Sequence, residues 1–367
     1  MSAFDTLKTP KSQNSSSDIT YYGYQLKTHQ FPPELTCPSP SKQIKARSFT
    51  TGHKHIVESK NLNFIQAPRF SSDFDCYGVI GEGEFSIVYK VLQRGSNSFY
   101  AVKKIKSKCR GVKDREHFLK EVKKLAHLSS VISDSQRHLV QYFDSWEEDR
   151  HIYIRTELCD TSLKTYLALN NFIEENIIWK VLFEVCKGLD LIHSENYIHL
   201  DIKPSNLFLK ENVVKIGDFG HMIEEGYEVL NEGDIAYVAP EVLSGSASFA
   251  SDVYSLGLVL FEMSTGVVLP DSGIPWHNLR TGLMPIECLN VSEKLKNLIL
   301  RMTYPEPESR ISISEILCME NPLATPNSAR KSSMKPKTVP FDFRILEVEE
   351  SPCDHLAINL LSSFNAV

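Results

Sequence analysis

The stretch His199-Leu200-Asp201-Ile202-Lys203-Pro204-Ser205-Asn206, with Lys215-Ile216-Gly217-Asp218-Phe219-Gly220 downstream, decides the fold of this chain. The two segments read as H-x-D-x-K-x-x-N and D-F-G. Phosphoryl transfer from ATP needs a carboxylate that orients the attacking hydroxyl, a cation on the transferred phosphate and oxygen ligands for Mg2+. Asp201, Lys203 and the pair Asn206 and Asp218 supply these groups in that order. A polar loop and a turn would explain a lone D-F-G, but the full spacing predicts a catalytic loop.

Composition sets the outer limits of the interpretation. The chain has 367 residues, 42% of them hydrophobic, which allows one large domain or two of ordinary size. A formal net charge of -6 argues against general nucleic-acid binding. The eight cysteines form no C-x-x-C pair and indicate reduced thiols of an intracellular protein. The first residues lack a secretory signal pattern, and no apolar run approaches the ~20 residues that span a bilayer.

The two ends of the chain differ in composition from its middle. Residues 1 to about 70 and the tail from about Ala324 are rich in Ser, Pro and Lys and have no sustained helix or strand period. This composition predicts disorder. We expect the tails to receive phosphate from proline-directed kinases, although such pairs are also frequent in tails without this role. The candidate acceptors, each followed by proline, are Thr9, Ser39, Thr325 and Ser351.

A glycine-rich turn and a lysine-bearing strand precede the catalytic stretch. Gly81 and Gly83 lie in a strand-turn-strand pattern, and glycines let a backbone close over phosphates. Ser86 replaces the third glycine, so the turn alone could equally be a hairpin without a ligand. The apolar run Tyr100-Ala101-Val102-Lys103 ends on a lysine, which predicts that Lys103 binds the α- and β-phosphates. Lys104 should point to the opposite face of the strand, toward solvent.

Apolar periodicity predicts the elements around these motifs. Residues 114–128 read as a helix carrying Glu121, which we prefer to Glu116 as the partner of Lys103. Residues 139–142 and 151–154 read as strands. The linker Thr156-Glu157-Leu158-Cys159 should join two lobes and offer its backbone to adenine, with Thr156 at the back of that pocket.

Two further helices are predicted around the catalytic loop, at 174–193 and 251–264. Asp252 could cap the second helix or bond the catalytic-loop backbone. His199 should have a structural role, packing on Phe219. Ala239-Pro240-Glu241 matches A-P-E, and Arg310 is the expected buried partner of Glu241.

Together these residues resemble the eukaryotic protein kinases, from about Phe74 to Pro322. The resemblance implies an α+β, bilobal fold with a small β-rich N-lobe and a larger helical C-lobe. The implied organisation is a disordered tail at 1–70, a kinase domain at 71–322 (N-lobe 71–156, hinge 157–160, C-lobe 161–322) and a C-terminal tail at 323–367.

The same resemblance implies ATP and Mg2+ as cofactors. It implies catalytic roles for Asp201, Lys203, Lys103 and Glu121, and metal binding by Asn206 and Asp218. The implied nucleotide site consists of Ile80, Gly81, Glu82, Gly83, Val88, Ala101, Lys103, Thr156, Glu157, Cys159 and Phe208.

Within that family the chain resembles the Wee/Myt class, the kinases that inhibit cyclin-dependent kinases. Four features carry this: Leu200 in place of the arginine of His-Arg-Asp, Phe208 at the adenine floor, Glu232-Gly233-Asp234 before Tyr237, and residues 269–280, which are similar to a run in the Myt branch. The Myt branch carries a membrane segment after its kinase domain. This chain shows none, so we do not expect membrane association.

The segment from Asp218 to Glu241 contains no Ser, Thr, Lys or Arg. Leu200 cannot receive a phosphate as an arginine would, so we expect this loop to be ordered without phosphorylation. Asp234 stands where a serine/threonine kinase usually has threonine, and it could draw Lys203 aside to admit tyrosine. Asp201-x-Lys203 alone would suggest a serine/threonine kinase. The resemblance decides for tyrosine, with an adjacent threonine as a second acceptor.

Three functions remain open at this point. The leading one is a monomeric kinase, nuclear or cytoplasmic, that phosphorylates the inhibitory tyrosine of a cyclin-dependent kinase–cyclin complex and delays mitosis or meiosis. The second is a pseudokinase scaffold, which the presence of the catalytic residues disfavours. The third is an active serine/threonine kinase of another pathway, which Asp234 and Phe208 disfavour.

Overall fold

The computed structural model describes residues 68–131, 138–170, 172–229, 233–320 and 322. Within helix α2 it describes only the backbone of residues 112–114 and 116–121. The predicted tails, with their four candidate phosphate acceptors, fall almost wholly outside these ranges, so the predicted domain limits stay predictions. Among the described residues, no helix is both long and apolar enough to cross a membrane.

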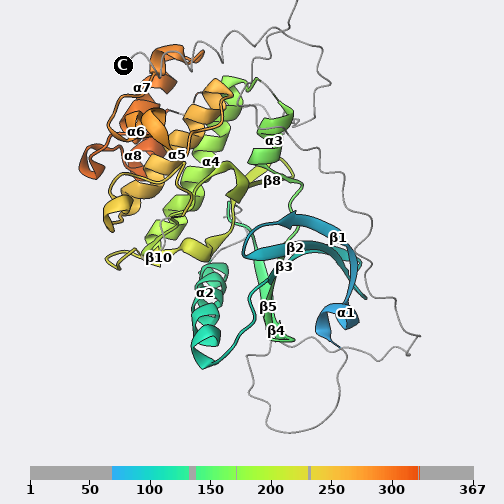
Figure 1. The fold of residues 1–367 in the computed structure, drawn as a ribbon. Coiled ribbons are helices and arrows are strands. Elements are labelled where there is room, and N and C mark those ends of the chain that lie inside the picture. The colour runs from blue at the N-terminus through green and yellow to red at the C-terminus, as the bar shows by residue number, and fades with distance from the viewer. Residues whose placement is uncertain (1–67, 132–137, 171, 230–232, 321, 323–367) are drawn as a thin grey trace, which may run out of the picture. The chain divides into compact units, whose positions relative to one another are not determined.

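The N-terminal lobe is a five-stranded antiparallel sheet in the order β1-β2-β3-β5-β4 (Figure 1). Side chains alternate along β3 (Ser98–Ile105), so that Ala101 and Lys103 line the cavity between the lobes and Val102 is buried on the opposite face. Lys104 lies on the same face as Val102, which confirms that it points away from the cavity. On that face Lys104 lies over the Tyr153 ring, 5.5 Å from its centroid, and is only half-exposed. The strands are β1 Phe74–Glu82, β2 Ser86–Gln93, β3 Ser98–Ile105, β4 Tyr142–Glu148 and β5 His151–Glu157.

Two helices pack on this sheet. Phe70 of the short helix α1 (Arg69–Asp73) covers the outer apolar face, where Phe74, Val91 and Val102 are buried. Helix α2 (Val112–Val131) contains the predicted helix and buries Val122, Leu125 and Leu128. Leu125, which we expected to contact the Phe219 region, is buried in the same main core as Phe219 and lines the same cavity.

The strand predicted at residues 139–142 is wrong, because β4 begins only at Tyr142. Leu139 forms an isolated parallel bridge with Ile216, and Val140 N–H donates to the Ile216 carbonyl at 2.8 Å. The first half of this run therefore bonds to the C-terminal lobe, whereas the Gln141 carbonyl accepts the Glu157 N–H of β5 at 2.9 Å and Tyr142 opens β4.

The C-terminal lobe is organised around α4 and α5, which run side by side (Figure 1). Its helices are α3 Leu163–Leu169, α4 Glu175–Ser194, α5 Phe249–Thr265, α6 Gly273–Arg280, α7 Glu293–Met302 and α8 Ile313–Cys318. Two small sheets hold the catalytic region, formed by β6 Thr161–Ser162, β8 Leu207–Lys210 and β9 Val213–Ile216, and by β7 Tyr197–Ile198 with β10 Ile223–Glu224. Short 3-10 turns are η1 Pro204–Asn206, η2 Phe219–His221, η3 Val242–Ser244, η4 Ile286–Cys288 and η5 Pro307–Ser309. The α+β, two-lobed fold expected from the sequence is confirmed.

Candidate active site

Helix α4 and strand β7 deliver the loop that carries His199 and Asp201. The His199 side chain is fully buried, with its ring 5.5 Å from the Phe219 ring and Nε2 3.3 Å from the Gly217 carbonyl oxygen. Burial lowers the pKa of His199, so the imidazole is neutral. The predicted structural role of His199 is confirmed, since its ring fixes the catalytic loop to the D-F-G turn.

Asp252 at the start of α5 holds the backbone of the same loop. Its carboxylate accepts hydrogen bonds from the backbone N–H groups of His199 at 2.8 Å and Leu200 at 2.9 Å, and lies 2.9 Å from His193 Nε2. Burial alone would raise the pKa of Asp252, but these partners hold it below its ordinary value. Of the two roles predicted for Asp252, the bonding of the catalytic-loop backbone is confirmed. The prediction that Asp252 caps the helix is wrong, because α5 begins at Phe249 and Ser248 occupies the N-cap position.

Asp201, Asn206, Lys203 and Asp234 form one connected polar cluster. Asn206 Nδ2 donates to Asp201 Oδ2 at 2.7 Å, and Lys203 Nζ lies 3.0 Å from Asp201 Oδ1. The same Nζ lies 3.3 Å from Asp234 Oδ2, and Asp234 N–H donates to Asp201 Oδ1. Burial would lower the pKa of Lys203, but the two carboxylates raise it above its ordinary value. Lys203 is thus a cation shared between Asp201 and Asp234, and Asp234 belongs to the activation segment, which comprises residues 218–241.

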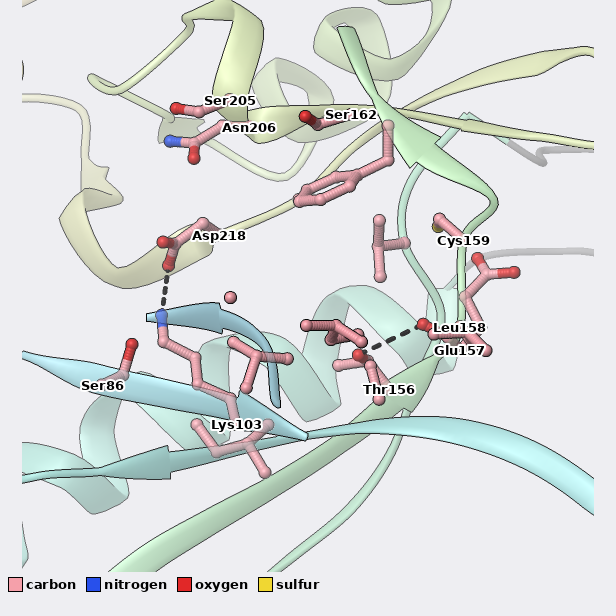
Figure 2. Close-up of a pocket in the computed structure, with 18 of the residues that line it drawn as sticks. Ser86, Lys103, Thr156, Glu157, Leu158, Cys159, Ser162, Ser205, Asn206 and Asp218 are labelled. Atoms are coloured by element: carbon pink, nitrogen blue, oxygen red, sulfur yellow. Dashed lines mark hydrogen bonds and ion pairs between the residues drawn. The ribbon is translucent and has the colours of Figure 1, made fainter. Parts of the chain in front are cut away.

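Lys103 and Asp218 meet across the lobes, 2.6 Å apart (Figure 2). Burial would raise the pKa of Asp218, but the Lys103 cation holds it below its ordinary value. Asp218 has a φ of 57°, a left-handed conformation that aspartate tolerates. The side chain of Glu121, the predicted partner of Lys103, lies outside the described residues.

A cavity of ≈ 630 Å³ lies between the lobes and ends at the Lys103–Asp218 pair. Figure 2 shows Lys103 and Ser86 on the lower side of the cavity and Asn206 and Ser205 on the upper side. The linker residues Glu157, Leu158 and Cys159 lie at the right of the view. The structure brings every residue of the predicted nucleotide site to this wall: Ile80, Gly81, Glu82, Gly83, Val88, Ala101, Lys103, Thr156, Glu157, Cys159 and Phe208.

The wall also contains residues that no sequence motif indicated. Ser162 and Thr165 reach it from β6 and α3, and their local sequence carries no signal of this position. Gly217 is required by packing, because a Cβ there would lie 2.9 Å from both Phe208 Cε2 and Val140 Cγ2. That glycine, next to the D-F-G motif, allows the Phe208 ring to lie under the cavity.

The linker residue Glu157 uses its side chain for structure. Its buried carboxylate lies 2.8 Å from Lys210 Nζ and 2.7 Å from Lys215 Nζ, and it accepts the Gln141 N–H. Burial would raise the pKa of Glu157, but these donors hold it below its ordinary value. The Glu157 contribution to a ligand would come from its backbone. Burial raises the pKa of the neighbouring Cys159 thiol to about 12, so that thiol is neutral.

The chemistry of the cavity wall fits a metal-bound nucleotide. Apolar side chains such as Val88 and Phe208 line one part, and the polar end offers a cation with the Asp218 carboxylate and the Asn206 amide. Asn206 Nδ2 is used on Asp201, which leaves its amide oxygen for a metal. One carboxylate with one amide is the sparse protein donor set typical of Mg2+ bound jointly with phosphates.

Near the end of the activation segment, the hydroxyl of the partly buried Tyr237 donates to the buried Glu262 carboxylate of α5. Burial raises the pKa of Glu262 from about 4.5 to about 7. Between these values the folded protein binds a proton that the unfolded chain does not, so stability must fall as pH rises.

We therefore expect the free energy of unfolding to decline between about pH 5 and pH 8 more steeply in the wild type than in Glu262→Gln. Urea denaturation across this range measures the difference. Parallel curves for the two proteins would show that Glu262 titrates normally.

The comparisons with known proteins agree with this geometry. The protein kinase domain family matches residues 74–321, so the chain belongs to the protein kinase family and is an enzyme of that class. Its relatives include Wee/Myt-class kinases, as the sequence motifs predicted. It is 34% identical over 262 residues to the membrane-associated tyrosine- and threonine-specific cdc2-inhibitory kinase of Drosophila melanogaster, covering 70% of this chain and 48% of the relative.

Two further relatives extend the comparison. The chain is 34% identical over 316 residues to the mitosis inhibitor protein kinase wee1 of Schizosaccharomyces pombe, covering 76% of this chain and 34% of the relative. It is 36% identical over 263 residues to a probable protein kinase of Dictyostelium discoideum, covering 67% of this chain and 72% of the relative. The chain thus spans less than half the length of the two named inhibitory kinases.

Proposed function

We propose that this kinase phosphorylates the inhibitory tyrosine of a cyclin-dependent kinase bound to its cyclin, with the adjacent threonine as a second acceptor, and so delays mitosis or meiosis. The observation that carries the proposal is the sharing of Lys203 between Asp201 and Asp234. The name of the Drosophila relative supports the same choice of substrate, and the name of the fission-yeast relative supports the delay of mitosis.

In this proposal the chain's own residues divide the work of phosphoryl transfer. Bound magnesium-ATP would supply the phosphoryl group, with Lys103 and its partner Glu121 at the α- and β-phosphates and Asn206 and Asp218 at the metal. Asp201 orients the acceptor hydroxyl and takes its proton, held in place by Asn206. Lys203 places a positive charge where the transferred phosphate would lie.

Asp234 is the residue that we propose biases acceptor choice. Its carboxylate draws Lys203 toward the activation segment, which leaves room for the longer reach of a tyrosine hydroxyl. A threonine at this position would lack that charge and would leave Lys203 paired with Asp201 alone.

Asp234→Thr should therefore shift the product ratio from phosphotyrosine toward phosphothreonine. The ratio is measured by phospho-amino-acid analysis of the same acceptor, at matched total activity. Asp234→Asn is the control for the loss of charge alone. An unchanged ratio in both variants would remove Asp234 from acceptor choice.

Activity should not depend on phosphorylation of the activation segment, since residues 218–241 contain no Ser, Thr, Lys or Arg. Of the two tyrosines there, Tyr237 is engaged with Glu262 and Tyr227 is 66% exposed. Tyr227→Phe and phosphatase-treated wild type should keep the turnover of untreated enzyme. Silencing by both treatments would contradict the proposal.

The decisive test is a reconstituted reaction. Purified protein, magnesium-ATP and a catalytically dead cyclin-dependent kinase–cyclin complex are incubated and read with phosphotyrosine- and phosphothreonine-specific detection. Phosphotyrosine on the inhibitory site supports the proposal. Transfer only to serine or threonine of other proteins indicates a serine/threonine kinase of another pathway, and no transfer to any acceptor indicates a pseudokinase scaffold. We propose a monomer that acts in the nucleus or cytoplasm, where its substrate complex is found.

A further inference from the structure

Two side chains of α6 converge on one backbone oxygen of the activation segment. Trp276 Nε1 donates to the Ile235 carbonyl at 2.9 Å, and Arg280 Nη2 donates to the same oxygen at 2.6 Å. The guanidinium carbon of Arg280 lies 4.0 Å from the centroid of the Trp276 ring, and Nη1 donates to the Trp276 carbonyl. Both lone pairs of the Ile235 oxygen are thus occupied by donors from a single helix.

Arg280 is an unusual residue to find in this position. Its side chain is buried, at 5% exposure, and no carboxylate lies within ion-pair distance of it among the described residues. Its Nε is a buried donor without a hydrogen-bond partner there. Burial lowers the pKa of Arg280 to about 10. Burying a cation in this way is costly, and the contacts that offset the cost are the Trp276 ring and the Ile235 carbonyl.

The peptide group held by this pair adjoins the catalytic cluster. Ile235 follows Asp234 and opens a single turn, in which the Asp234 carbonyl accepts hydrogen bonds from the N–H groups of Tyr237 and Val238. Asp234 Oδ1 accepts the Ala236 N–H, while Oδ2 faces Lys203. Fixing the Ile235 carbonyl from outside therefore fixes the direction in which the Asp234 carboxylate points.

We propose that Arg280 and Trp276 are positioning residues: by fixing the peptide group of Ile235 they hold the Asp234 carboxylate, and with it Lys203, in place beside Asp201. A phosphate on the activation segment does not perform this task here, because residues 218–241 contain no Ser or Thr to carry it and no Lys or Arg to bind it. The device consists of side-chain donors on a backbone carbonyl, and it needs no modification to form. This inference rests on the roles proposed above for Asp201, Lys203 and Asp234.

The test compares Arg280→Met and Trp276→Phe with a matched control, Arg301→Met. Arg301 lies on α7, half-exposed and 3.7 Å from Glu315, away from the acceptor site. We expect the KM for the protein acceptor to rise at least about tenfold in Arg280→Met, the range of a lost hydrogen bond to a charged group. Trp276→Phe should give a smaller rise in the same direction. The KM for ATP should stay unchanged in all three variants, because the cavity wall is not altered.

A purely structural role would give a different pattern. Melting temperature and kcat would fall together while both KM values stayed constant, and this result would overturn the proposal, as would wild-type kinetics in both variants. If Arg280→Met does not fold, Trp276→Phe decides, because it keeps an aromatic ring beside Arg280 while it removes the N–H donor along with part of the indole.

The same kinetics are measured on a glutamate–tyrosine copolymer as a generic acceptor. Failure of the wild type on the cyclin-dependent kinase complex with activity on the copolymer would reject the proposed substrate alone. The positioning role would then be decided by the acceptor KM values on the copolymer.

Discussion

An Asp201→Asn enzyme should transfer phosphate at least ~10²-fold more slowly than the wild type while keeping its fold. The Asp201 carboxylate is only 5% exposed and lies at the centre of the cluster, between Lys203 at 3.0 Å and Asn206 Nδ2 at 2.7 Å. An asparagine fills the same space but cannot take a proton from the acceptor hydroxyl. Single-turnover kinetics at saturating ATP measure the chemical step, and thermal unfolding checks the fold.

Lys103→Ala should abolish transfer in the same assay, since it removes the cation that faces Asp218. The adjacent Lys104→Ala is the matched control, because Lys104 lies on the opposite face of β3 over Tyr153. Loss of activity in Lys103→Ala alone would tie the effect to the cavity. A folded Asp201→Asn protein with near-normal turnover would exclude Asp201 as the orienting carboxylate.

Residues whose roles depend on short spacings could be predicted well from the sequence. Asp201, Lys203 and Asn206 lie within one loop, so their relative positions follow from a few backbone angles, and the structure brings them together. The alternation of β3 likewise predicted which of Lys103 and Lys104 faces the cavity. In these cases local geometry leaves little freedom.

Contacts that depend on tertiary packing were predicted less well. Residues 139–142 have the composition of a strand, but Leu139 and Val140 pair with Ile216, a partner that no local pattern reveals. The choice between two roles for Asp252 depended on where α5 begins, and Ser248 takes the N-cap position there, with its backbone N–H donating to Ser251 Oγ at 3.2 Å. The hydrogen bonds from Trp276 and Arg280 to the Ile235 carbonyl join residues about 40 positions apart, and no local sequence pattern predicts such a contact.

Arg310→Met should destabilise the C-terminal lobe more than any other single change considered above. All five N–H donors of Arg310 are used: two on the Glu241 carboxylate at 2.6 and 2.7 Å, and three on the carbonyls of Ala250, Tyr304 and Pro305. This confirms the pairing with Glu241 expected from the sequence. Removing one partner of a buried ion pair costs about 3–5 kcal/mol, because the other charge is left without compensation.

The double variant Arg310→Met/Glu241→Gln separates the stranded charge from lost packing. If the buried Glu241 carboxylate causes most of the cost, its removal should restore much of the free energy of unfolding, measured by urea denaturation. The exposed Arg301→Met serves as the control and should change the unfolding midpoint little, since its ion pair is open to solvent. Equal instability of the single and double variants would instead assign the cost to the three backbone carbonyls that Arg310 holds, and its main role would then be to join the start of α5 at Ala250 to the backbone of Tyr304 and Pro305 rather than to neutralise Glu241.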